Sequence, residues 1–166
     1  MNKRWLAILF LISTLFLSSC SSYYKSVSMD KMDAGRKEVP RKFAEAYLEK
    51  CAKKDYTPFE GFNISKKFER VITADSLRKS CAWIEKKYGT VRVKELVSVH
   101  TYSRPADFMD IFNFKLETEK SKEPRFLHIG VYRDKNFIDV PFYFDGNENY
   151  LAARQKKYRQ YKKKNK

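Results

Sequence analysis

The sequence has little glycine, little proline and almost no histidine. Five glycines and five prolines among 166 residues exclude collagen-like and low-complexity architectures, which need one or both residues in abundance. Hydrophobic residues make up 43% of the chain and aromatic residues 16%, so a core can be buried and wholesale disorder is excluded. The length corresponds to about one ordinary domain.

Motifs of common enzyme and metal sites are also missing from the sequence. It contains no glycine-rich phosphate loop, no HExxH pair and no CxxC pair. In the strand pairing predicted below, His100 and His128 share a sheet face but lie about 20 Å apart, too far to hold one metal ion. We therefore expect no metal site and no cofactor.

The apolar run near the N-terminus is too short to cross a membrane. It covers the thirteen residues Trp5–Leu17 and follows the basic residues Lys3 and Arg4. As a helix it would be about 20 Å long, whereas a bilayer core is roughly 30 Å thick. A basic start, a short apolar stretch and small residues after it are typical of a secretory signal peptide.

Leu17 is followed by Ser18, Ser19 and Cys20, and this element resembles the lipobox of bacterial lipoproteins. The resemblance implies cleavage after residue 19, a diacylglyceryl group on the Cys20 thiol and acylation of the new N-terminus. Such acyl chains would hold the protein on a lipid bilayer in the cell envelope, outside the cytoplasm. Ser21 stands where many inner-membrane lipoproteins have aspartate, which favours the outer membrane. The alternative is an ordinary signal peptide in which Cys20 is incidental.

Acidic residues are scarce compared with basic ones. The 35 basic and 20 acidic residues give a net charge of +15, which becomes +13 when residues 1–19 and their two basic residues are removed. Eight basic and no acidic residues lie in 154–166, namely Arg154, Lys156, Lys157, Arg159, Lys162, Lys163, Lys164 and Lys166.

This basic tail, residues 147–166, predicts binding to an anionic surface. Anionic lipid headgroups, lipopolysaccharide and wall polymers are the candidate partners, because the export signal argues against nucleic acid. Leu151, Tyr158 and Tyr161 follow a helix-like spacing, consistent with a weakly amphipathic extension. The alternative is a solvated, disordered tail that keeps the protein soluble.

Helical spacing of apolar residues predicts three helices after a polar tether over residues 20–39. The first begins at Pro40 and runs to Lys54, a short second one covers 64–72, and the third lies between Thr73 as N-cap and Gly89. Cys51 and Cys81 fall on the core-facing stripes of the first and third helices. In an exported chain, two such cysteines form either a disulfide or a pair of buried thiols.

After Gly89 the apolar period changes to two. Four strands are predicted over 90–102, 107–119, 125–133 and 137–144, and the short links between them favour an antiparallel meander. Pairing Phe112 with Val97 and Val131, and Val131 with Ile138, collects a single apolar face. That face comprises Val97, Phe112, Phe114, Leu116, Leu127, Ile129, Val131, Ile138, Val140 and Phe142.

The predicted fold class is α+β, with the three helices packed on one face of a curved four-stranded sheet over residues 40–146. The segments RKFAEAYLEKCAKKD and ADSLRKSCAWIEKKYG and the strands ending in NFIDVPFYF follow an order that resembles the cone-shaped nuclear-transport-factor-2-like fold and the related cystatin-like lipoproteins of bacteria. Those superfamilies include enzymes as well as binding and assembly modules, so the resemblance alone implies no activity.

Two functional hypotheses follow from these observations. The first is a non-catalytic envelope lipoprotein whose domain binds or supports a partner at the membrane surface. One candidate partner is a protein that the sequence does not identify. The alternative is a small cone-pocket enzyme of isomerase or hydrolase type, with Asp110 or His128 as candidate bases. For Asp110, a cross-strand ion pair with Arg133 is the competing interpretation. A space between helices and sheet filled by phenylalanine would favour the binding module.

Overall fold

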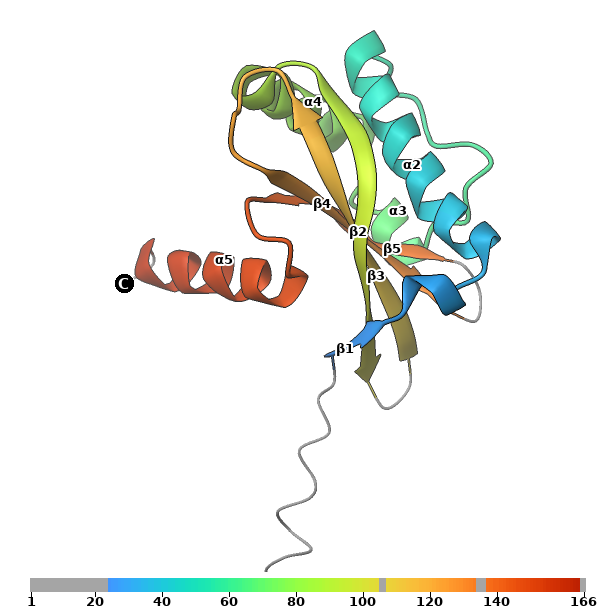
Figure 1. Cartoon of the computed structure of the whole chain (residues 1–166). Coiled ribbons are helices and arrows are strands. Elements are labelled where there is room, and N and C mark those ends of the chain that lie inside the picture. The colour runs from blue at the N-terminus through green and yellow to red at the C-terminus, as the bar shows by residue number, and fades with distance from the viewer. Residues whose placement is uncertain (1–23, 105–106, 134–136, 165–166) are drawn as a thin grey trace, which may run out of the picture.

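The computed structural model describes residues 24–104, 107–133 and 137–164 (Figure 1). They form a mixed α+β fold with an open antiparallel sheet ordered β1-β2-β3-β4-β5. None of the helices in these ranges is both long and apolar enough to cross a membrane. In chain order the elements are β1 (Tyr24–Val27), the 3-10 turn η1 (Met29–Lys31), α2 (Ala34–Lys53), α3 (Lys66–Glu69), α4 (Ala74–Tyr88), β2 (Val91–Arg104), β3 (Asp107–Thr118), β4 (Arg125–Tyr132), β5 (Ile138–Asp145) and α5 (Tyr150–Lys164).

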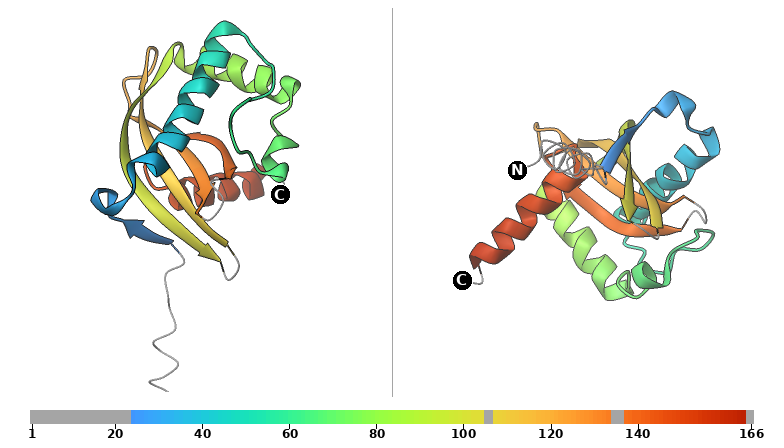
Figure 2. Two further views of the ribbon diagram at one scale, coloured as in Figure 1. Left: turned by 90° about the vertical axis from the view of Figure 1, so that its right-hand side faces the viewer. Right: turned by 90° about the horizontal axis from the view of Figure 1, so that it is seen from below.

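Helices α2, α3 and α4 cover one face of the curved sheet, and α5 lies on the other side (Figure 2). Helix α4 begins and ends where predicted, because the Thr73 hydroxyl accepts a hydrogen bond from the Ser76 amide and Gly89 adopts a positive φ of 68°. The disulfide between Cys51 and Cys81 is confirmed and joins α2 to α4.

The tether predicted over residues 20–39 is wrong from Tyr24 onward. Strand β1 pairs with β2, with Tyr24 opposite Tyr102, so the sheet has five described strands instead of the four predicted. Helix α2 starts at Ala34, because the Asp33 side chain caps it by accepting a hydrogen bond from the Arg36 amide. Pro40 therefore lies inside this helix, not at its start.

The predicted strand pairing is right in parts of the β2–β3 and β4–β5 pairs and is shifted elsewhere. Val131 lies opposite Ile138, as predicted, but Phe112 lies opposite Val99 and Ile129. Two single-residue register shifts in β2, between residues 93 and 95 and between 96 and 98, cause the change in the β2–β3 pair. Two such shifts restore the original face, so Val99 is buried there and the predicted Val97 is only half-buried. The β3–β4 pair differs from the predicted register by two residues along its whole length.

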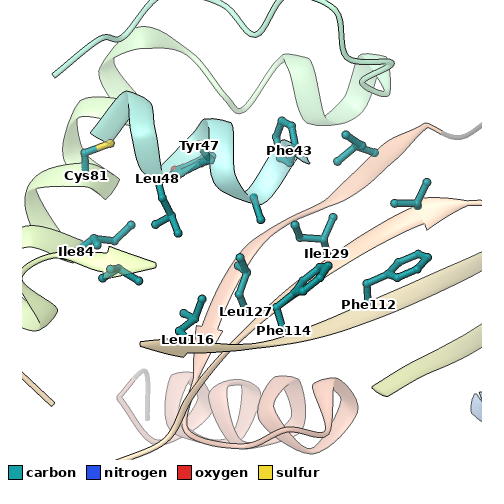
Figure 3. Close-up of a cluster of buried hydrophobic side chains, with 14 of the residues drawn as sticks. Phe43, Tyr47, Leu48, Cys81, Ile84, Phe112, Phe114, Leu116, Leu127 and Ile129 are labelled. Atoms are coloured by element: carbon teal, nitrogen blue, oxygen red, sulfur yellow. The ribbon is translucent and has the colours of Figure 1, made fainter. Parts of the chain in front are cut away.

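The core lies between the sheet and the helices α2, α3 and α4 (Figure 3). The sheet residues predicted to be buried on this face are buried, apart from Val97 and from Val140 and Phe142, whose side chains lie outside the described ones. The buried residues of this cluster are Phe43, Ala44, Tyr47, Leu48, Phe68, Leu77, Cys81, Ile84, Tyr88, Val91, Val99, Phe112, Phe114, Leu116, Leu127, Ile129, Val131 and Ile138.

The C-terminal segment also differs from the prediction. The predicted boundary at residue 146 would separate the tail from the domain. In the structure, however, Tyr150 is buried against Ile111 on the outer face of the sheet. Beyond that contact the segment continues as helix α5, which matches the helix-like spacing noted for the tail and not its disordered alternative.

Candidate functional site

The space where a cone-fold enzyme would hold its substrate is filled with aromatic side chains. Phe43 from α2 and Phe112 and Phe114 from β3 are fully buried between helices and sheet (Figure 3). Rings from the 55–63 loop pack against Phe43 as well, with Phe59 at 5.0 Å and Phe62 at 5.3 Å between centroids. A surface cavity of about 210 Å³ lies elsewhere, beside the disulfide. The interior thus favours a packed module over a reaction chamber.

Asp110, a candidate base, lies buried at one end of the sheet and is fully engaged. Its Oδ1 is 2.8 Å from the Arg133 guanidinium, which confirms the predicted ion pair, and accepts a hydrogen bond from the Thr101 hydroxyl at 2.8 Å. Its Oδ2 is 2.6 Å from the guanidinium of Arg36 in α2, a partner that the sequence did not indicate.

These contacts keep Asp110 ionised. Burial raises its pKa, but the hydrogen bonds from Arg133 and Thr101 and the two positive charges outweigh it, so the pKa of Asp110 lies below its ordinary value. A carboxylate held in this way is a poor proton acceptor near neutral pH. Asp110 therefore fixes α2 against the end of the sheet and does not suit the role of a catalytic base.

His128, the other candidate base, lies on the outer face of the sheet and has no exposed surface. Its Nδ1 donates to Asn113 Oδ1 at 2.6 Å, and the Asn113 amide donates in turn to His100 Nδ1 at 3.2 Å and to Ser98 Oγ at 3.1 Å. The predicted separation of about 20 Å between the two histidines is therefore wrong. The register shifts in β2 place Ser98 opposite Asn113, and the β3–β4 register places His128 opposite the same residue, so one amide joins the two imidazoles.

Tyrosines from both ends of the described chain cover this polar network. The Tyr24 ring of β1 stacks on His100 with centroids 4.5 Å apart, and Tyr150 of α5 lies 5.6 Å from His128. Burial raises the pKa of Tyr24 to about 12 and lowers the pKa of His128 to about 4. His128 is therefore neutral at pH 7, and within the described ranges no cluster of three or more potential metal-ligating side chains is present.

Helix α5 projects from the domain and carries the basic residues predicted for the tail, apart from Lys166 (Figures 1 and 2). Asn149 caps its first turn, since its Oδ1 accepts hydrogen bonds from the amides of Leu151 and Ala152. Lys157, Lys162 and Lys164 lie in the helix without described side chains, and Lys166 lies outside the described residues. The described side chains beyond Ala152 are all exposed, namely Arg154, Gln155, Lys156, Arg159, Gln160, Tyr161 and Lys163.

Cys20, the predicted lipid attachment site, lies outside the described residues. No protein-family model, curated protein or solved structure matches the chain. The basis for a function is therefore the chemistry of the described side chains together with the N-terminal sequence.

Proposed function

We propose that the protein is a lipid-anchored protein of the cell envelope whose α+β domain is a non-catalytic binding module. Cys20 carries the lipid, and helix α5 binds anionic headgroups of the bilayer in which the lipid sits. The packed interior supports a module in preference to the cone-pocket enzyme, and the helices on one face of a curved sheet are consistent with the cone-like fold.

The observation that carries this proposal is that the first described residue packs in the same cluster as the start of α5. Tyr24 lies four residues after Cys20, and it packs in the same cluster as Tyr150, the first residue of α5. Four residues span at most about 14 Å. A lipid on Cys20 would therefore hold the base of α5 close to the bilayer surface.

The charge of α5 fits this position. Arg159 and Lys163 are one helical turn apart, and like charges at that spacing destabilise a helix in water. Anionic headgroups remove this repulsion and add about 1 kcal/mol for each basic residue near the surface. The helix, about 22 Å long, can place several of its cations on a bilayer at once.

Co-flotation with vesicles tests the role of α5. The chain from Ser21 onward, without lipid, is mixed with phosphatidylcholine vesicles that contain or lack phosphatidylglycerol. Replacing Arg154, Lys156, Arg159 and Lys163 with glutamine should weaken binding to the anionic vesicles by about 4 kcal/mol, close to a thousandfold. Binding of the unaltered chain should also fall steeply as salt rises, because surface charges are screened within about 8 Å at physiological ionic strength.

A matched variant removes the same charge elsewhere. Lys66, Lys86, Lys94 and Lys122 are exposed and lie outside α5, so their replacement by glutamine should leave most of the binding intact. Equal losses in the two variants would mean that net charge, and not α5, controls binding. Salt-sensitive binding to a purified wall polymer but not to anionic vesicles would overturn the choice of lipid as partner.

A further inference from the structure

One end of the sheet exposes a large aromatic side chain beside a cation. Phe108, the second residue of β3, is 55% exposed. The guanidinium carbon of Arg133 lies 5.8 Å from the centre of its ring, and the Arg133 side chain is itself 47% exposed. A phenylalanine exposed to this extent has no role in the core, so the pair is available to an external surface.

The ion-pair network beside Phe108 carries a net positive charge. Arg133 and Arg36 share one carboxylate, that of Asp110, and the three side chains together carry a charge of +1. Asp110 is buried, whereas Arg133 reaches solvent, so the excess positive charge lies on the outside. An exposed ring next to a guanidinium that shares its one carboxylate with a second arginine suits a surface with apolar and anionic groups in close proximity, as in the headgroup region of a bilayer.

The same end of the sheet is where the chain leads toward Cys20. Strand β1 pairs antiparallel with β2, and its first residue, Tyr24, lies opposite Tyr102, two residues from the end of β2 at Arg104. Phe108 lies opposite Ser103, in the same hairpin. The described chain therefore begins beside this hairpin, with only residues 21–23 between Tyr24 and Cys20 (Figure 1).

We infer that the β2–β3 hairpin is a second point of contact with the bilayer, with Phe108 inserted among the headgroups and Arg133 on a lipid phosphate. This inference depends on the proposed lipid anchor at Cys20. Together with α5, the hairpin gives the domain a fixed orientation, with α4 turned away from the membrane. Trp83 lies at that far end, because its ring packs against Phe144. Phe144 is opposite Leu127, and Leu127 is opposite Phe114. Phe114 lies about 20 Å along β3 from Phe108.

Tryptophan quenching by lipids tests the orientation in the complete lipid-modified protein. Removal of residues 1–19 leaves Trp83 as the one tryptophan of the chain. A second form carries Trp83→Phe and Phe108→Trp, so that its only tryptophan lies in the hairpin. Both forms are reconstituted into vesicles of phosphatidylglycerol and phosphatidylcholine with brominated acyl chains, which quench tryptophan only within the bilayer.

We expect severalfold stronger quenching, and a blue-shifted emission, for the hairpin tryptophan than for Trp83. Both residues are exposed in the domain, so the fold should tolerate both changes, and an unchanged unfolding temperature verifies it. Equal, weak quenching of both forms in protein that floats with the vesicles would overturn the hairpin contact and leave the anchor standing. Protein that does not float with the vesicles would overturn the anchor, and the hairpin contact with it.

Discussion

Lowering the pH from 7 to 5 should destabilise the domain by about 2 kcal/mol through His128 alone. Burial lowers the pKa of His128 from 6.5 to about 4 in the folded protein. The unfolded chain binds a proton at this imidazole near pH 6.5, so between about pH 6.5 and 4 the unfolded state holds more protons. The stabilising effect of the neutral, buried imidazole is complete above this window and is lost as the pH falls through it.

Urea denaturation of the oxidised protein at several pH values measures this loss. His128→Asn is the matched variant, because its amide nitrogen takes about the place of the imidazole Nδ1, so it can still donate to Asn113 Oδ1 but does not titrate. The variant should be less stable than the wild type at pH 7, yet its stability should change much less between pH 7 and 5. The remaining dependence should come from His100, whose pKa burial also lowers. Parallel losses in wild type and variant over this range would refute the assignment to His128.

Three further predictions concern the stability of the folded domain. Reducing the Cys51–Cys81 disulfide, which closes a 30-residue separation, should lower the free energy of unfolding by about 3.5 kcal/mol, and equal urea midpoints with and without reductant would contradict it. Asp110→Asn should cost about 3–5 kcal/mol, because two arginines lose their shared carboxylate, and calorimetry showing an unchanged unfolding temperature would argue against the ion-pair network. Phe114→Ala should also cost about 3–5 kcal/mol in urea denaturation, and a loss below 1 kcal/mol would mean that the interior is not packed as described.

Elements governed by local patterns could be predicted from the sequence. The third predicted helix was right at both ends because its signals are local: a threonine that can cap the first turn and a glycine that tolerates a positive φ. The alternation of apolar residues also identified most of the buried sheet face. The ion pair between Asp110 and Arg133 could be predicted from the same alternation, because both residues lie where the apolar pattern of neighbouring strands is interrupted.

Features that depend on distant parts of the chain could not be predicted. Strand β1 has only four residues, and its hydrogen bonds go to a strand more than seventy positions later. The shifts within β2 and the exact β3–β4 register have no marker in the sequence, yet together they decide that Asn113 connects His100 and His128. Ile111, an apolar residue on the outer face of β3, is a sign in the sequence of a second buried surface on that face.

The mass of the N-terminal peptide of the mature protein, isolated from its native membranes, tests whether Cys20 carries the lipid anchor. We expect a peptide that begins at Cys20 and carries the added mass of a diacylglyceryl group, with or without a further acyl chain on its amine. A mature protein that begins at another residue, or at an unmodified Cys20, would contradict the lipid anchor and the membrane-facing orientation that follows from it.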